Sequence, residues 1–177
     1  MIHETEHLGE TSGLPAAAPA NDPDATVATI MTPGVVTIDM DAPLHQVQRI
    51  FQREGFHHLL VIEEGELVGV ISDRDLLSAI SPYVNTPSEQ RRDQQTLRRR
   101  AHQIMSRRLV TVLPSTAITE AAGLLLKHKV GCLPVVAPAD PAPLNDDSRL
   151  RLVTAGRRIE GIVTWRDVLA YYLGRET

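Results

Sequence analysis

Two short segments of this chain carry a residue pattern that suits the binding of a phosphorylated sugar. Each contains a glycine, two β-branched residues, a hydroxyl and, three residues after the hydroxyl, an aspartate: Gly69-Val70-Ile71-Ser72-Asp73-Arg74-Asp75 and Gly161-Ile162-Val163-Thr164-Trp165-Arg166-Asp167. Where a strand ends at the hydroxyl and a helix begins after it, backbone N–H groups and the positive end of the helix dipole favour an anion. Because the pattern occurs twice, we expect a tandem binding module and not a single catalytic cleft.

The same spacing also fits a simpler structural role. Ser72-x-x-Asp75 and Thr164-x-x-Asp167 resemble capping boxes, although Glu or Gln is the usual partner at the third helical position. The two roles are compatible, because a helix without a ligand still needs a cap. The pattern alone therefore leaves open whether one motif or both bind a ligand.

An internal repeat surrounds the two motifs. Ile30-Met31-Thr32 recurs as Ile104-Met105-Ser106, and Leu59-Leu60-Val61-Ile62 recurs as Leu133-Pro134-Val135-Val136, in both cases 74 residues later. The glycine-to-aspartate motif recurs 92 residues later, so the second copy contains 18 extra residues before its motif.

Each copy predicts the element order β-α-β-β-α from its apolar periodicity. The first copy is expected to have a β-like segment at 35–38, a helix that has Pro43 in its first turn, strands at 59–63 and 67–72, and a helix at 73–80. The second is expected to have a β-like segment at 109–113, a helix capped by Ser115 or Thr116, strands at 133–137 and 159–164, and a helix at 165–173. About 55 residues make a marginal core, so we expect two α+β repeats with their sheets face to face, helices outside and pseudo-twofold symmetry.

Two stretches lie outside this repeat. Residues 1–26 are acidic and rich in Ala and Pro, and they are predicted to form a disordered tail. Residues 138–158 are rich in Pro, Asp and Asn and are predicted to form a hairpin excursion far from Thr164, in which 149–154 adds a strand.

The linker between the repeats is basic. Thr86-Pro87-Ser88-Glu89 resembles a helix start, so residues 87–104 are predicted to form a helix within a linker at 83–103, between a first domain at 27–82 and a second at 104–175. Its arginines could form a solvated face or contact ligand phosphates, a partner or a second copy. Seven arginines fall between residues 90 and 108: Arg91, Arg92, Arg98, Arg99, Arg100, Arg107 and Arg108.

Composition excludes several classes of function. Aromatic residues make up 3% of the chain, too few for the stacking platforms of single-stranded nucleic-acid binders. Cys132 is the only cysteine, so neither an internal disulfide nor a cysteine zinc cluster is possible, and a reducing cytoplasmic setting is expected. His57, His58 and His128 lack metal-ligand spacing, and no secretory signal or membrane span is indicated.

The doubled motif in this context resembles a pair of CBS domains, also called a Bateman module, over residues 27–173. The resemblance implies that the clefts between the paired domains bind adenosine-containing ligands such as AMP, ADP, ATP or S-adenosylmethionine. It further implies a regulatory protein without enzymatic activity, a homodimer and a separate, unidentified target protein.

The resemblance also assigns roles position by position. The hydroxyls of Ser72 and Thr164 correspond to phosphate contacts, and Asp75 and Asp167 to carboxylates that accept hydrogen bonds from ribose hydroxyls. The other positions are the phosphate clamps Arg74 and Arg166, and the base-binding positions Val36, Val110, Phe56, His57, Val130 and Gly131. Arg107 and Arg108 lie just before the second base-binding segment, so they are further candidates for phosphate contact.

The sequence also allows two competing functions. The Arg-rich linker helix could bind nucleic acid or a partner protein, but the net charge of −4 and the scarcity of aromatic residues oppose nucleic acid. An enzyme of nucleotide turnover is disfavoured, because the sequence shows no paired carboxylates, metal cluster or glycine-rich phosphate loop.

Overall fold

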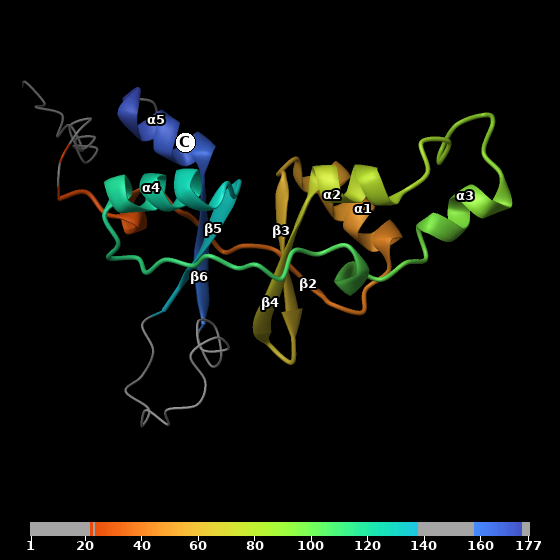
Figure 1. The fold of residues 1–177 in the computed structure, drawn as a ribbon, viewed down its shortest axis with the longest axis horizontal. Coiled ribbons are helices and arrows are strands. Elements are labelled where there is room, and N and C mark those ends of the chain that lie inside the picture. The colour runs from red at the N-terminus through yellow and green to blue at the C-terminus, as the bar shows by residue number, and fades with distance from the viewer. Residues whose placement is uncertain (1–21, 23, 138–157, 175–177) are drawn as a thin grey trace, which may run out of the picture.

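Two three-stranded sheets face each other at the centre of the molecule, and helices cover their outer sides (Figure 1). The structure is a computed structural model that describes residues 22, 24–137 and 158–174 of the 177. An apolar cluster fills the space between the sheets, with Leu60 and Leu67 from one and Cys132 and Ile162 from the other. The predicted α+β fold with facing sheets and outer helices is confirmed.

The first sheet belongs wholly to the first repeat. Its strand order is β2-β3-β4, with β2 parallel to β3 and β3 antiparallel to β4. The hairpin between β3 and β4 turns at Glu64 and Gly65, both of which have positive φ, as a tight primed turn requires. The elements are β2 (Thr37–Asp39), α1 (Leu44–Glu54), β3 (His58–Glu63), β4 (Glu66–Ser72) and α2 (Asp73–Ala79).

The second sheet combines both repeats. Its order is β1-β6-β5, and both pairs of neighbouring strands are antiparallel. Strand β1 comes from the first repeat, whereas the other two strands and their helices come from the second. The elements are β1 (Thr32–Pro33), α4 (Ile118–His128), β5 (Cys132–Val136), β6 (Ile159–Thr164) and α5 (Trp165–Tyr172).

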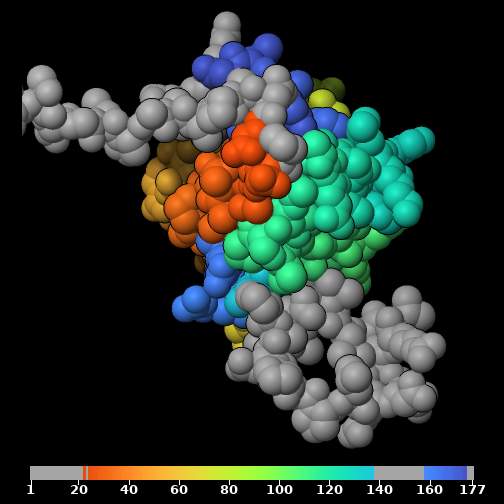
Figure 2. Space-filling model, turned by 90° about the vertical axis from the view of Figure 1, so that its left-hand side faces the viewer, coloured from red at the N-terminus to blue at the C-terminus, as the bar shows by residue number. Residues whose placement is uncertain are grey.

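The segment that precedes each repeat packs on the other repeat. The short 3-10 helix η1 (Val27–Thr29) contributes Val27 to the core of the second repeat, and Val27 N–H donates to the Thr116 carbonyl at 2.8 Å. Its counterpart η2 (Ala101–Gln103) contributes Ala101 to the core of the first repeat, and Ala101 N–H donates to the Ala42 carbonyl at 2.8 Å. Figure 2 shows the orange N-terminal segment lying against the green and teal second repeat. The two repeats are therefore interlocked.

This exchange explains the glycine of each motif. A Cβ added to Gly161 would lie 2.8 Å from the carbonyl oxygen of Thr32 and 3.0 Å from the sulfur of Met31. A Cβ added to Gly69 would overlap the side chain of Met105. The glycine of each motif thus admits the Met-Thr or Met-Ser segment of the opposite repeat, and this links the two sequence patterns that recur.

The β-like segment predicted at 109–113 is wrong as a strand. Only Val112 pairs there, in a single parallel bridge with Val135, whereas the first repeat forms the three-residue strand β2. Two prolines of the second repeat explain the difference. Pro134 stands at the position equivalent to Leu60, and Pro114 at the position equivalent to Met40. In the first repeat the N–H of Met40 donates to the Ile62 carbonyl. Neither proline has an N–H to donate, so the ladder cannot extend.

The predicted helix caps also need correction. Pro43 precedes α1 as its N-cap, and α4 follows Ala117 without a side-chain cap from Ser115 or Thr116. The first helical N–H of α4 donates instead to the carbonyl of Ala25, which is buried. Residue 25 therefore belongs to the folded unit, so the predicted tail at 1–26 reaches too far.

The linker is not one continuous helix over 87–104. It contains the six-residue helix α3 (Arg91–Thr96), which Gln90 and not Thr86 caps, and then η2. The N–H groups of Ala101 and His102 donate to the carbonyls of Ala42 and Met40, and this pairing draws the chain out of a helix. The excursion predicted at 138–158 lies outside the described residues except for Arg158.

Candidate functional site

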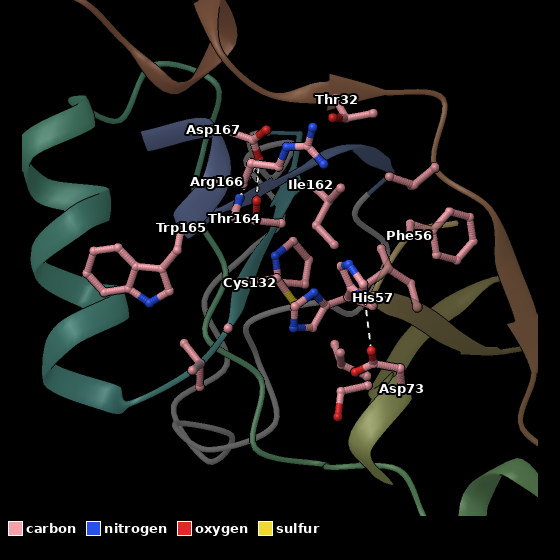
Figure 3. A pocket seen from close by; sticks show the side chains of 18 of the residues that line it. Thr32, Phe56, His57, Asp73, Cys132, Ile162, Thr164, Trp165, Arg166 and Asp167 are labelled. Atoms are coloured by element: carbon pink, nitrogen blue, oxygen red, sulfur yellow. Dashed lines mark hydrogen bonds and ion pairs between the residues drawn. The ribbon is translucent and has the colours of Figure 1, made fainter. Parts of the chain in front are cut away.

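One cleft collects every site residue that the sequence predicts. It has a volume of about 1240 Å³ and is lined by both repeats. Figure 3 shows Thr164, Arg166 and Asp167 on one side and Phe56, His57 and Asp73 on the other. The predicted residues that line it are Val36, Phe56, His57, Ser72, Arg74, Asp75, Arg108, Val110, Val130, Gly131, Thr164, Arg166 and Asp167.

Strand pairing divides this cleft into two equivalent halves. Thr32 pairs with Ile162, two residues before Thr164, so these three side chains emerge on one face of the sheet. Ser106 bridges Val70, two residues before Ser72, in the same way. We call the surroundings of Ser72–Asp75 with Ser106 the first half-site, and those of Thr164–Asp167 with Thr32 the second half-site.

Thr32 and Ser106 were missed as site residues, although both line the cleft. The signal was present, because the repeated Met-Thr and Met-Ser pairs keep a hydroxyl at the same offset. What sequence reasoning lacked was the exchange that carries each hydroxyl to the opposite motif.

Both motifs form capping boxes. Asp75 Oδ2 accepts from the N–H of Ser72 at 2.8 Å and from its hydroxyl at 2.6 Å. Asp167 Oδ2 accepts from the N–H of Thr164 at 2.7 Å and from its hydroxyl at 2.8 Å. Among the described residues, no hydrogen bond reaches Oδ1 of either carboxylate, so each retains acceptor capacity for a ligand.

The first half-site contains an additional charged pair. His57 Nδ1 donates to Asp73 Oδ2 at 2.8 Å, and the Arg74 N–H donates to Asp73 Oδ1 at 2.8 Å. Partial burial opposes ionisation, but the bonds from His57 and from the Arg74 backbone hold the pKa of Asp73 below its usual value. A carboxylate thus occupies the beginning of α2.

The second half-site has no such pair. Gly131 and Trp165 stand where the first half-site has His57 and Asp73. The indole of Trp165 packs against the core of the second repeat, and Figure 3 shows it turned towards α4. The beginning of α5 therefore carries no acidic side chain before the buried Asp167, which is 6% exposed.

His58 and Cys132 lie between the two half-sites, where both line the cleft. Burial raises the pKa of the Cys132 thiol to about 12, so the thiolate is absent at neutral pH and Cys132 packs as a small apolar residue. Burial also lowers the pKa of His58, which Asp73 and Asp75 oppose and His57 reinforces.

The arginines serve different purposes. Arg108 lines the cleft together with Arg74 and Arg166, whereas Arg107 is not among the residues that line it. In the linker, Arg99 donates to the Ala79 carbonyl and Arg100 to the Asp41 carbonyl, so these two hold the linker against the first repeat.

Two features are absent from residues 22, 24–137 and 158–174, the part of the chain that the structure describes. Within these ranges no three His, Cys, Asp or Glu side chains gather as a metal site would require. Within the same ranges no helix is long and apolar enough to cross a membrane.

Known proteins share this sequence pattern and fold. A family model described as CBS domain matches residues 27–82 and 101–174. Protein MJ1225 of Methanocaldococcus jannaschii is 27% identical over 152 residues, or 85% of this chain and 48% of the relative, so this chain spans about half of that protein. The crystal structure of MJ1225, described as a proposed archaeal homologue of g-AMPK, has a TM-score of 0.62 over 85% of this chain and 49% of that one.

Two solved structures are similar over nearly their whole length. The CBS domain pair of MJ0100 with 5′-methylthioadenosine and S-adenosyl-L-methionine is 22% identical, with a TM-score of 0.62 over 87% of this chain and 100% of that chain. CBSX2 in complex with AMP is 26% identical, with a TM-score of 0.60 over 84% of this chain and 96% of that chain. Together with the family model, which matches well over half of the residues, these likenesses show that the chain belongs to the CBS domain family and folds as a CBS domain pair.

Proposed function

We propose that this chain is a regulatory module without enzymatic activity, which binds adenosine-containing nucleotides such as AMP, ADP or ATP, or S-adenosylmethionine, in the cleft between its two CBS domains. The observation that carries the proposal is the meeting of two equivalent motifs, one from each repeat, in one cleft. Its volume of about 1240 Å³ exceeds the ~300–1,000 Å³ of ordinary small-molecule pockets, so there is room for more than one ligand.

Each half-site offers matching chemistry. A ribose hydroxyl can donate to Oδ1 of Asp75 or Asp167, while Oδ2 keeps the helix cap. The Ser72 hydroxyl now donates to Asp75, so a phosphate that accepts this proton would replace the carboxylate as its partner. The exposed guanidinium groups of Arg74, Arg108 and Arg166 can neutralise phosphate charge at the rim.

Relatives support this ligand class. CBSX2 was solved with AMP, and the MgtE cytosolic domain, 27% identical over 81% of this chain with a TM-score of 0.57, was solved with ATP. The chain spans 47% of that MgtE structure. The single buried cysteine also fits the cytoplasmic setting that we propose.

Isothermal titration with AMP, ADP, ATP and S-adenosylmethionine tests the proposal. Binding of at least one ligand is expected, and absence of heat with all of them would count heavily against it. Mass spectrometry of small molecules released from the purified protein identifies a ligand that is retained during purification.

We further propose that the module forms a homodimer through its outer helices. The homodimer would then act on a separate target protein. Leu77 on α2 and Leu169 on α5 occupy equivalent positions and are 69% and 55% exposed, and Leu173 beyond α5 is 67% exposed. Apolar side chains at equivalent points of two helices suit a two-fold contact between copies. Analytical ultracentrifugation measures the association directly.

The exposed arginines of the linker support a second candidate function. Arg91, Arg92 and Arg98 are exposed at α3 and just after it, and within the described part of the chain their side chains form no hydrogen bond or ion pair. These three arginines could bind nucleic acid or an acidic partner. A salt-dependent gel shift with DNA and RNA decides for or against nucleic acid, because phosphate contacts release counterions.

A further inference from the structure

The backbone N–H groups at the start of α2 already have partners inside the protein. The Asp73 N–H donates to the His57 carbonyl at 3.1 Å, and the Arg74 N–H donates to Oδ1 of Asp73 at 2.8 Å. The Asp75 N–H donates to the Ser72 hydroxyl at 3.2 Å. A helix start attracts anions because its first N–H groups lack partners within the helix, so the first turn of α2 has no backbone donor left for a phosphate.

The start of α5 is built differently. Both Trp165 and Arg166 line the cleft, and within the part of the chain that the structure describes neither of their N–H groups donates to the protein. The side chain of Trp165 has no oxygen with which to cap the Arg166 N–H, as Asp73 caps its neighbour in the first repeat. The start of α5 therefore keeps two backbone donors at positions where α2 has none.

A negative charge adds to this difference. The carboxylate of Asp73 lies at the start of α2, where its Oδ1 accepts from the backbone and its Oδ2 accepts from Nδ1 of His57 at 2.8 Å (Figure 3). The arginines do not offset it, because Arg74 and Arg166 occupy equivalent positions and both line the cleft. A phosphate would therefore meet one more carboxylate at the helix start of the first half-site than at that of the second.

We propose that Asp73 sets the ligand preference of the two half-sites: the second half-site takes the phosphorylated adenosine ligand, and the first favours an adenosine ligand whose 5′ group is neutral or cationic. This inference rests on the proposed function and deepens it, because it assigns a ligand class to each half of the cleft. The hydroxyls of Ser72 and Thr164 alone predict two equivalent phosphate contacts. Asp73, one residue after Ser72, removes that equivalence.

The expected preference has a definite direction. Each half-site offers a carboxylate Oδ1 to ribose, on Asp75 or on Asp167, so adenosine should bind the two half-sites with similar affinity. AMP should bind the second half-site about tenfold more tightly than the first, or more, which is the effect of one additional charge at a partly exposed position. The side chain of Asp73 is 38% exposed, and this exposure limits the effect.

Titration calorimetry with AMP and with adenosine resolves the binding steps, and the fluorescence of Trp165 assigns them. Trp165 is the only tryptophan of the chain and lines the cleft in the second half-site, so its fluorescence should change when that half-site is filled. In wild-type protein the tight AMP step should carry the fluorescence change and the weak step should not. Asp75→Ala should remove the weak step and keep the tight one.

Variants of Asp73 test the cause. Asp73→Asn removes the charge but keeps an oxygen that can accept from the Arg74 N–H, and it should strengthen the weak AMP step about tenfold. Asp73→Ala also frees that N–H and should strengthen the step at least as much. S-adenosylmethionine, whose 5′ group carries a sulfonium cation, should not gain affinity in either variant.

The matched control is Asp41→Asn. Oδ1 of Asp41 lies 3.1 Å from Nδ1 of His102, so the chain contains a second aspartate–histidine pair, and neither of its members is among the residues that line the cleft. This variant should bind every ligand as wild-type protein does.

Several results would overturn the inference. Equal AMP affinities at the two half-sites of wild-type protein would show that Asp73 does not discriminate, and so would an unchanged weak step in Asp73→Asn. Loss of the tight AMP step in Asp75→Ala would place the phosphorylated ligand in the first half-site. An equal gain for S-adenosylmethionine and AMP in Asp73→Asn would exclude charge as the cause. Binding of adenosine without any binding of AMP would also contradict it, whereas no binding of AMP, adenosine or S-adenosylmethionine would instead refute the proposed function itself.

Discussion

The two halves of the cleft share a scaffold but differ in chemistry. Both begin with a glycine that admits the opposite repeat, and both end in an aspartate that caps a helix. Between these points the first half-site has the His57–Asp73 pair, whereas the second has Gly131 and Trp165. The difference shows that the repeat conserves backbone contacts, while the side chains between them are free to set what each half binds.

The largest effect is expected where the interlock is tightest. Gly161→Ala would force a Cβ against a backbone carbonyl, and we expect it to destabilise the protein by about 3 kcal/mol, compared with about 1 kcal/mol for Gly69→Ala. The difference arises because a Cβ on Gly69 would overlap Sδ and Cγ of Met105, which can rotate away, and would lie 3.1 Å from its Cβ, where a small shift is enough. Urea denaturation measures both values, and equal losses would show that the two contacts are equivalent after all.

The aspartates come next. We expect Asp167→Ala to weaken binding at the second half-site tenfold or more, because a charge-assisted hydrogen bond is worth about 1.5–3 kcal/mol. It should also destabilise the fold by about 2 kcal/mol, more than the about 1 kcal/mol expected for Asp75→Ala, because Asp167 is the more buried cap.

Calorimetry of the single and double aspartate variants separates the halves. Each single variant should retain one binding step and the double variant neither. Unchanged affinity in both single variants would refute the assignment of these carboxylates to ribose.

A smaller effect is expected at the outer surface. Leu77→Asp and Leu169→Asp each place a charge on the exposed faces of α2 and α5, and in the proposed homodimer either should raise the dissociation constant by about tenfold or more. Leu126→Asp is the matched control, because Leu126 is 66% exposed on α4 and its counterpart on α1 is the polar Gln52. If wild-type protein sediments as a monomer, the proposed homodimer is wrong.

Local sequence signals predicted the elements beside the motifs well. Strand β6 and the starts of α2 and α5 lie where the apolar pattern and the Ser72 and Thr164 caps place them. The packing of Met31 and Met105 on the opposite repeats could not be predicted in this way. It depends on pairing between residues far apart in the sequence, such as Thr32 and Ile162, which are more than a hundred positions apart. The absence of a strand near Val112 could be predicted in principle, because Pro114 and Pro134 lack the backbone N–H groups that a strand ladder needs. That prediction requires knowing which segments pair with these two prolines.

The smallest effect concerns the charged pair that only the first half-site has. Because the pKa of folded Asp73 lies below its usual 3.8, its stabilising contribution is complete above that value and is lost as pH falls through the folded pKa. Asp73→Asn should therefore lower the melting temperature slightly at neutral pH and flatten its decline in acid, with no difference once the wild-type carboxyl is protonated.

Thermal denaturation from neutral pH down to about pH 2.5 follows this change, with Glu63→Gln as a control, because Glu63 is an exposed carboxylate in the hairpin. The side chain of Asp73 is 38% exposed, so solvent screening keeps the effect small. A parallel acid decline in wild type and Asp73→Asn would mean that the pair does not stabilise the fold. The His57–Asp73 pair would then distinguish the two half-sites only through the ligands that each half-site can accept.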